Sequence, residues 1–272
     1  MPLPTVKGIG TFYREYGDIK KEHVLFIHGL GSSSHRWVDI PEALSKYFHT
    51  ITVDLIGSGL SEKPQNADYT IKGFSKFIVD FLIERIGIMD KEHKKISIVG
   101  HSLGGYIAAQ VAIENKEMIE KLVLIDSSGL LEAPTQLLKD YRVAATDINP
   151  LTRHERVKRV LEDLYASPSR LLPVLVDLFG YTIEKPGAKH AFEVAFDNST
   201  TTQIDPNGFK QIEDIPCLVI WGEKDKLIPI EYASMFTESL KRAKFEKIED
   251  AGHSPFVEKT ALVYEKLRTF LS

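Results

Sequence analysis

The stretch Ile96-Ser97-Ile98-Val99-Gly100-His101-Ser102-Leu103-Gly104 decides the fold of this chain. It opens with a short apolar run that favours a buried strand, and the apolar residues after Ser102 favour a buried helix. Between them lies a G-x-S-x-G motif, Gly100–Gly104, whose glycines leave room for a tight turn of the backbone. This context predicts that Ser102 lies at the tip of a strand-to-helix turn, beside the free N–H groups of the helix start.

Strand-like and helix-like segments alternate on both sides of this motif. Further strand-like runs are His23–His28, Thr50–Leu55, Leu122–Asp126, Cys217–Trp221 and Lys244–Ile248. Apolar positions with helical spacing occur in Thr70–Ile86, Leu103–Ile113, Ile230–Leu240 and Lys259–Leu271. Strand runs that are apolar throughout are typical of parallel strands covered on both faces. The pattern predicts an α/β protein with a mostly parallel central sheet, flanked by helices and joined by right-handed crossovers.

The alternation stops between about Ser128 and Gly208. This stretch has helical patterns and no convincing strand, and its prolines fall mostly between the patterns, which are Thr135–Ala145, Arg153–Tyr165, Leu171–Phe179 and Lys189–Phe196. We therefore expect an all-helical insertion, residues 128–207, over one edge of the sheet. The core would then consist of two parts, residues 1–127 and 208–272.

Composition excludes several classes of protein. The chain has 272 residues, with 34 Lys and Arg against 38 Asp and Glu, and a net charge of −4. No basic cluster marks a nucleic-acid partner, and the nearest charge run, Lys91–Lys95, is interpreted as a solvated turn. The single cysteine, Cys217, lies in an apolar run and is predicted to be a buried hydrophobic residue. No G-x-G-x-x-G fingerprint or metal-ligand cluster is present, so no cofactor and no metal are expected.

Neither a secretory signal nor a membrane segment is predicted. Met1–Gly10 contains no apolar core of the kind found in signal peptides. Residues Ile96–Ile113 carry no charged side chain, but three glycines, two serines and a histidine argue against a membrane span. We expect a cytoplasmic protein without membrane insertion, and the sequence carries no signal for its oligomeric state.

Two polar stretches follow later strand runs and can complete a catalytic set with Ser102. Asp225 follows the run Cys217–Trp221, and His253 lies between the last strand run and the last helix. The carboxyl ends of parallel strands meet at one edge of the sheet, where ligands bind in open α/β folds. Asp225 could therefore orient His253. Asp126, which ends another strand run, is the alternative acid, and Asp225 is favoured because glycine and proline frame it.

The first strand run leads into a second glycine-rich turn, His28-Gly29-Leu30-Gly31. A flexible loop there can direct backbone N–H groups at a developing oxyanion. His28 and His101 adjoin the glycines of the two turns and are expected to shape these loops. Asp54 precedes a third glycine-rich stretch and is expected to anchor it.

Together these residues resemble the α/β-hydrolase superfamily, and the resemblance spans most of the chain. The order Ser102…Asp225…His253 matches that family's Ser…acid…His order, and the pattern D-x-x-G-x-G-x-S is complete from Asp54 to Ser61. The resemblance implies that Ser102 is the nucleophile, His253 the general base and Asp225 the orienting acid. It also implies an oxyanion hole formed by the backbone N–H groups of Leu30 and Leu103, and a cap formed by the inserted helices.

The resemblance predicts a carboxylesterase that forms an acyl-enzyme on a small-molecule ester. Alternatives on the same residues are a C–C bond hydrolase, a lactonase or thioesterase, and a cofactor-free haloperoxidase-like enzyme. A small-molecule receptor with slow or vestigial hydrolysis is the alternative of another class. Aromatic residues predict a preference for neutral, fairly apolar substrates, and the residues expected to line the pocket are Trp37, Tyr106, Phe179 and Phe256.

Overall fold

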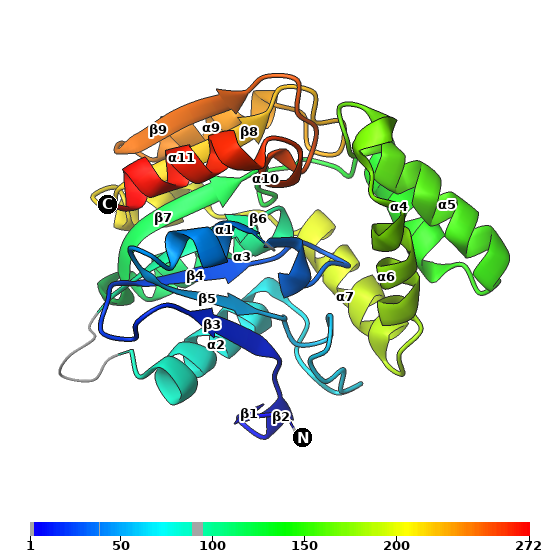
Figure 1. Ribbon diagram of the computed structural model, residues 1–272, viewed down its shortest axis with the longest axis horizontal. Helices are drawn as coiled ribbons and strands as arrows, with labels where there is room; N and C mark the ends of the chain where they lie inside the picture. The colour runs from blue at the N-terminus through cyan, green and yellow to red at the C-terminus, as the bar shows by residue number, and fades with distance from the viewer. Residues whose placement is uncertain (1–2, 38, 89–94) are drawn as a thin grey trace.

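The computed structural model describes residues 3–37, 39–88 and 95–272 (Figure 1). The charge run Lys91–Lys95, predicted to form a solvated turn, lies outside these ranges except for Lys95. Across the described ranges, no helix combines the length and the apolar composition needed to cross a lipid bilayer.

A seven-stranded sheet forms the centre of the molecule, in the order β3-β5-β4-β6-β7-β8-β9. Its strands are β3 (Tyr13–Tyr16), β4 (His23–Ile27), β5 (His49–Val53), β6 (Ile96–His101), β7 (Ile119–Ile125), β8 (Cys217–Gly222) and β9 (Ala243–Ile248). All neighbouring strands are parallel except β3, which pairs antiparallel with β5. The mostly parallel sheet predicted from the apolar runs is confirmed.

Three short strands were not predicted. β1 (Thr5–Val6) and β2 (Ile9–Gly10) form a separate two-stranded sheet near the N-terminus. β3 lies at the edge of the main sheet and carries the sequence Tyr-Arg-Glu-Tyr. An edge strand is covered less completely than a central strand, so it lacks the continuous apolar run that identified the others.

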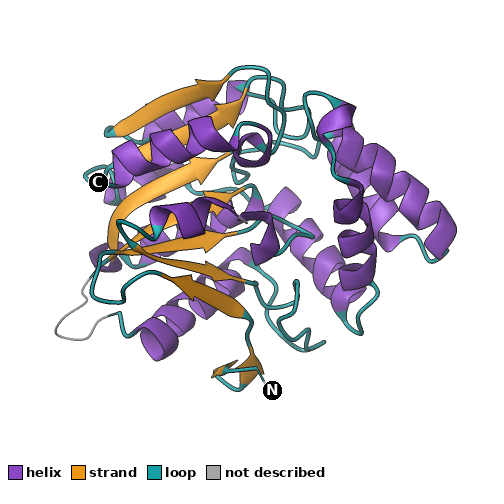
Figure 2. Cartoon of the chain, viewed as in Figure 1, coloured by secondary structure: helices purple, strands orange, loops and turns teal. Residues whose placement is uncertain are grey.

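Helices cover both faces of the sheet (Figure 2). Successive strand residues point to opposite faces: Val24 and Phe26 of β4 pack in one core cluster and Leu25 and Ile27 in the other. The first cluster includes apolar residues of α1 (Asp39–Leu44) and α11 (Thr260–Leu271). The second includes those of α2 (Ile71–Phe81), α3 (Leu103–Glu114) and α9 (Glu231–Ser239). The predicted helix Thr70–Ile86 ends as a π-helical turn, Leu82–Ile86.

Residues 128–208, all of which the structure describes, contain helices and no strand. The helices are α4 (Gln136–Thr146), α5 (Pro150–Asp163), α6 (Pro173–Ile183), α7 (Ala188–Thr201) and α8 (Pro206–Gln211). Thr135 caps α4 by accepting a hydrogen bond from the backbone N–H of Leu138. Pro150 and Pro173 lie in the first turns of their helices, where their missing N–H groups leave no helical bond unmade. Figure 1 shows α4–α7 beside the carboxyl ends of the strands.

The connectivity places the key loops at that same edge. β4 lies between β5 and β6, so the chain leaves β4 in one direction for β5 and then returns to its other side for β6. Such a switch in direction opens a crevice at the carboxyl ends of the strands. The loops after β4, β6, β8 and β9 carry Leu30, Ser102, Asp225 and His253, so all four residues lie on this side of the molecule.

Candidate active site

Ser102 occupies a strained turn between β6 and α3. Its backbone angles are φ 54° and ψ −121°, which a residue with a side chain seldom adopts. The turn is held because the Ser102 N–H donates a 3.0 Å hydrogen bond to the carbonyl oxygen of Ile125 on β7. The serine carbonyl oxygen also accepts from the backbone N–H groups of Gly105 and Ser128. Surrounding backbone therefore holds the predicted strand-to-helix turn in place.

The glycines of the motif are required by close backbone contacts. A Cβ atom at Gly100 would collide with the carbonyl oxygen of Gly104, and one at Gly104 would collide with the carbonyl oxygen of Ile27. A Cβ at Gly29, in the loop after β4, would lie 3.0 Å from the Cβ of Ser102. These contacts bring the loop after β4 directly against the serine turn.

Asp225 and His253 form a buried hydrogen-bonded pair. The Nδ1 atom of His253 lies 2.7 Å from Oδ2 of Asp225, and both side chains are almost fully inaccessible to solvent. The other carboxylate oxygen, Oδ1, accepts hydrogen bonds from the backbone N–H groups of Leu227 and Ile228, at 2.8 and 3.0 Å. Because Asp225 accepts from Nδ1–H, the Nε2 atom of a neutral His253 carries a free lone pair.

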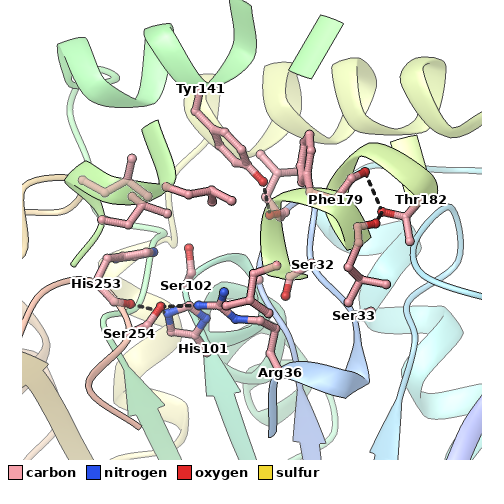
Figure 3. A pocket seen from close by; sticks show the side chains of 18 of the residues that line it. Ser32, Ser33, Arg36, His101, Ser102, Tyr141, Phe179, Thr182, His253 and Ser254 are labelled. Carbon is pink, nitrogen blue, oxygen red and sulfur yellow. Dashed lines mark hydrogen bonds between the residues drawn. The ribbon is translucent and has the colours of Figure 1, made fainter. Parts of the chain in front are cut away.

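Ser102 and His253 line the same cavity (Figure 3). Among the described residues, no hydrogen bond joins the two side chains. In catalytic pairs of this kind the bond is often long without substrate and shortens in the complex. The structure thus places His253 in direct contact with Asp225. It places His253 and Ser102 in the lining of the same cavity.

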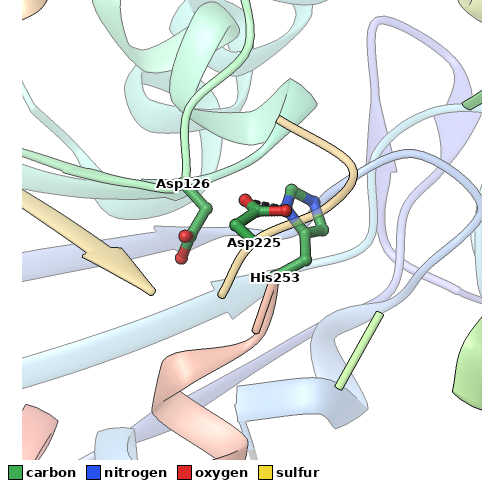
Figure 4. A group of neighbouring side chains, drawn as sticks. All are labelled: Asp126, Asp225 and His253. Atoms are coloured by element: carbon green, nitrogen blue, oxygen red, sulfur yellow. Dashed lines mark hydrogen bonds and ion pairs between the residues drawn. The ribbon is translucent and has the colours of Figure 1, made fainter. Parts of the chain in front are cut away.

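Asp126 lies on the far side of Asp225 from His253 (Figure 4). Its Oδ1 atom accepts a 2.8 Å hydrogen bond from the backbone N–H of Gly222. Burial, followed by the charge of Asp225, raises the pKa of Asp126 well above its usual range. The raised pKa favours the neutral form of Asp126, whereas Asp225 accepts the hydrogen bond from the imidazole of His253.

These three side chains also have the spacing of a metal site, since one ligand atom from each lies within 4.8 Å of the others. However, Nδ1 of His253 and Oδ2 of Asp225 are bonded to each other, and Oδ1 of Asp225 accepts two backbone N–H groups. This donor set fits a hydrogen-bonded relay better than a cation.

Hydrogen bonds of His28 and Asp54 hold the backbone around the predicted oxyanion hole. Within the described part of the chain, the N–H groups of Leu30 and Leu103 donate no hydrogen bond. His28 shapes the first of these loops, because its Nδ1 lies 2.8 Å from the Gly29 carbonyl oxygen and its Nε2 accepts from the N–H of Leu55. Asp54 accepts from the N–H groups of Ser34 and Leu60, as expected of a loop anchor.

His101 has a contact that sequence reasoning did not find. Its Nε2 atom lies 2.7 Å from the backbone carbonyl oxygen of His253, and the two imidazole rings lie 4.8 Å apart. Burial, followed by the nearby His253, lowers the pKa of His101 well below its usual value, so the ring is neutral and donates from Nε2. The residue before the serine therefore also fixes the loop that carries His253.

The helical segment contacts both loops of the site. The Tyr141 hydroxyl on α4 donates a 3.1 Å hydrogen bond to the Leu30 carbonyl oxygen, and the backbone N–H of His253 donates to the carbonyl oxygen of Leu164 after α5. Leucines from this segment and the loop after β8 form one wall of the cavity: Leu138, Leu161, Leu164, Leu175, Leu178 and Leu227.

Of the four residues predicted to line the pocket, only Phe179 does so in the described structure. Trp37 and Phe256 instead stack on each other, with ring centroids 4.4 Å apart, in the core beneath His101. Tyr106 packs in the other core cluster and donates a hydrogen bond to Thr202. These three predictions need correction, because large aromatic rings are commonly core residues and the helical segment supplies aliphatic side chains instead. Arg36, which sequence reasoning did not single out, lines the cavity.

Comparison with known proteins agrees with the fold. A profile of the alpha/beta hydrolase fold family matches residues 22–260, so the chain belongs to this family. It is 28% identical over 277 residues to Lipase 1 of Psychrobacter immobilis, covering 99% of this chain and 84% of that protein. It is 27% identical over 258 residues to the 2-hydroxy-6-oxo-6-(2'-aminophenyl)hexa-2,4-dienoic acid hydrolase of Metapseudomonas resinovorans, covering 92% and 83%.

A solved structure is also similar. The meta-cleavage product hydrolase of Pseudomonas fluorescens IP01 matches with a TM-score of 0.85 at 23% identity, covering 98% of this chain and 95% of that one. At this identity the likeness concerns the fold. The family and the named activities of the two sequence relatives support hydrolase activity for this chain.

Proposed function

We propose that this protein is a serine hydrolase that cleaves carboxylic esters, with Ser102 as nucleophile, His253 as general base and Asp225 as the acid that orients it. The observation that carries the proposal is the 2.7 Å contact between His253 and Asp225 in the wall of the cavity that Ser102 also lines. The strained backbone of Ser102 adds support, because strain of this kind is found at functional sites.

The reaction follows from the proton positions. Nε2 of His253 accepts the hydroxyl proton as Oγ of Ser102 attacks the ester carbonyl carbon, and Asp225 stabilises the imidazolium formed. The C–O bond of the ester then breaks, the alcohol leaves with the proton from His253, and the acyl group stays on Oγ. Water attacks this acyl-enzyme while His253 takes its proton, and the acid is released as Oγ regains a proton.

The oxyanion of each tetrahedral intermediate would be stabilised by the N–H groups of Leu30 and Leu103. Both N–H groups lack a partner in the described chain, and Leu103 begins α3, whose dipole favours negative charge at that end. Such contacts are each worth about 3–4 kcal/mol of barrier.

The helical segment, residues 128–207, would act as a cap that shapes the acyl or alcohol subsite. Its leucines give one cavity wall an apolar character, which supports esters with an apolar part of moderate size.

Hydrolysis of 4-nitrophenyl butyrate tests the proposal. The unaltered protein should show multiple turnovers, and Ser102→Ala should lose them, whereas Ser234→Ala on the exposed face of α9 serves as a matched control. A fluorophosphonate should label Ser102, with the adduct located by mass spectrometry. Turnover that survives in Ser102→Ala, or labelling at another serine, would contradict the proposal. Ligand binding without multiple turnover would instead indicate a receptor.

The second candidate function is hydrolysis of a carbon–carbon bond in a vinylogous diketone. It is favoured by the likeness to the dienoic acid hydrolase of Metapseudomonas resinovorans. Comparing kcat/KM for a 2-hydroxy-6-oxo-hexadienoate with that for 4-nitrophenyl butyrate separates the two candidates, because each predicts a preference for its own substrate.

A further inference from the structure

We propose that Arg36 forms a subsite for an acidic group of the substrate, so that the preferred ester carries a free carboxylate in addition to the scissile bond. This inference rests on the proposed ester hydrolysis and specifies its substrate class. It differs from the preference for neutral substrates that the sequence predicted. No role for Arg36 was predicted from the sequence.

Arg36 belongs to the short 3₁₀ helix Ser34–Trp37 that follows the loop after β4, and it is half-buried. It lines the same cavity as Ser102 and His253, and its side chain is directed towards them in Figure 3. Within the described ranges, its side chain makes one hydrogen bond, from Nη2 to the Oγ atom of Ser254, at 2.7 Å. A guanidinium has five N–H donors, so this one hydrogen bond leaves most of them available to a ligand.

No carboxylate within the described ranges forms an ion pair with Arg36. The oxygens of Asp225 are directed at His253 and at two backbone N–H groups. Withdrawing a cation partly from water without a counter-ion costs free energy. A carboxylate that binds in the planar, two-pronged manner that guanidinium favours would offset this cost.

Lys63, in the same region, is a cation whose N–H donors are used within the protein. It lines the neighbouring cavity, and its Nζ atom donates to three backbone carbonyl oxygens, those of Ser58, Gly59 and Ser61. All three of its N–H donors are therefore used within the protein. Arg36 differs, because its one hydrogen bond to a described residue, Ser254, leaves most of its donors available to a ligand.

The rest of the cavity limits the class of ligand. Ser32 and Ser33 line the cavity together with Arg36, whereas the lining contributed by the helical segment consists mainly of leucines. A ligand that matches this lining has an aliphatic part, which contacts the leucines, and an acidic end, which binds Arg36. Monoalkyl esters of aliphatic dicarboxylic acids have this chemistry.

Monoethyl adipate and ethyl hexanoate form the matched probe pair, because they differ in the terminal carboxylate and share the chain length and the ethyl ester. Released ethanol is measured for the unaltered protein, Arg36→Met, Arg36→Lys and Ser254→Ala. In Arg36→Met, the ratio of kcat/KM for the adipate to that for the hexanoate should fall about 10- to 100-fold. Arg36→Lys should retain part of the preference, since it keeps the charge and loses the planar fork.

Ser254→Ala is the control for a role of Arg36 in holding the His253 loop. It removes the observed hydrogen bond and keeps the charge, so it can slow both esters but should leave their ratio unchanged. An Arg36→Met protein that loses activity equally on both esters would overturn the proposal. Should that variant fail to fold, an unchanged ratio in Arg36→Lys, together with no preference for the adipate in the unaltered protein, would overturn it as well.

A binding measurement separates this inference from the proposed function. Calorimetric titration of Ser102→Ala with monoethyl adipate, with Arg36 present or replaced by methionine, needs no turnover. If no variant hydrolyses either ester and binding still depends on Arg36, ester hydrolysis is wrong and the acidic-group subsite stands. If both esters are hydrolysed and binding does not depend on Arg36, the proposed ester hydrolysis stands and the acidic-group subsite is wrong.

Discussion

The hydroxyl of Tyr141 on α4 donates a hydrogen bond to the carbonyl oxygen of Leu30, the residue whose N–H group is proposed to stabilise the oxyanion. A Cβ atom at the adjacent Gly31 would collide with that same hydroxyl, so the helix and the loop are closely fitted. A single side chain of the helical segment therefore supports the peptide groups that are proposed to stabilise charge in the transition state.

Tyr141→Phe should accordingly lower kcat and leave KM nearly unchanged. Loss of one hydrogen bond of this kind is worth about 0.5–1.5 kcal/mol, or roughly 2- to 12-fold in rate. Steady-state kinetics with 4-nitrophenyl butyrate measure the effect. Tyr165→Phe is the matched control, because the buried Tyr165 hydroxyl forms no hydrogen bond with any residue that the structure describes. Equal kcat values for Tyr141→Phe and the unaltered protein would show that the loop needs no such support.

The two buried carboxyl groups beside His253 should differ sharply in their importance. Asp225→Asn removes the acceptor of the Nδ1–H bond and should lower kcat by about 10³-fold or more. Asp126→Asn keeps an oxygen for the N–H of Gly222 and should retain most of kcat. The comparison uses one ester at saturating concentration. A larger loss from Asp126→Asn than from Asp225→Asn would reverse the assignment of the acid.

Asp126 should also make stability depend on pH. Its pKa is raised by burial and by Asp225, so above the pKa of an unfolded aspartate the native state binds a proton that the unfolded state has released. The free energy of unfolding contributed by this group therefore falls as the pH rises from about 4, the unfolded value, towards the raised native pKa. Asp126→Asn lacks this dependence.

Urea unfolding of Asp126→Asn and the unaltered protein at pH 5 and pH 8 measures the difference. The variant should gain stability relative to the unaltered protein as the pH increases, because the amide needs no proton to stay neutral. A difference that is constant with pH, or that changes in the opposite direction, would show that Asp126 is ionised in the native state across this range.

Features that depend on consecutive residues could be predicted from the sequence. The central strands were recognisable because both of their faces are buried, and the turn at Ser102 because its glycines meet backbone atoms directly. Asp225 and His253 could be predicted because each follows a strand of a parallel sheet, which brings their loops to one edge.

Features that depend on residues far apart in the sequence could not be predicted from it. Arg36 contacts Ser254, which lies 218 residues later, and no local pattern distinguishes this arginine from one on the surface. Trp37 was expected in the pocket because aromatic side chains commonly line pockets. Its stacking on Phe256 requires α10 (Pro255–Glu258) to pack against the short helix Ser34–Trp37, and only the folded structure reveals this contact.

Two glycine-to-alanine substitutions should have opposite effects on stability. Gly104→Ala places a Cβ atom against the carbonyl oxygen of Ile27, in backbone that cannot move without disturbing β4 and α3, and should cost at least about 2 kcal/mol. Gly180→Ala lies within α6, where the new methyl group meets nothing within 4 Å. It should stabilise the protein by about 0.5–1 kcal/mol, because alanine loses less backbone freedom on forming a helix. Midpoints of urea unfolding decide the matter, and a stable Gly104→Ala protein with normal activity would show that the turn at Ser102 tolerates a side chain at this position.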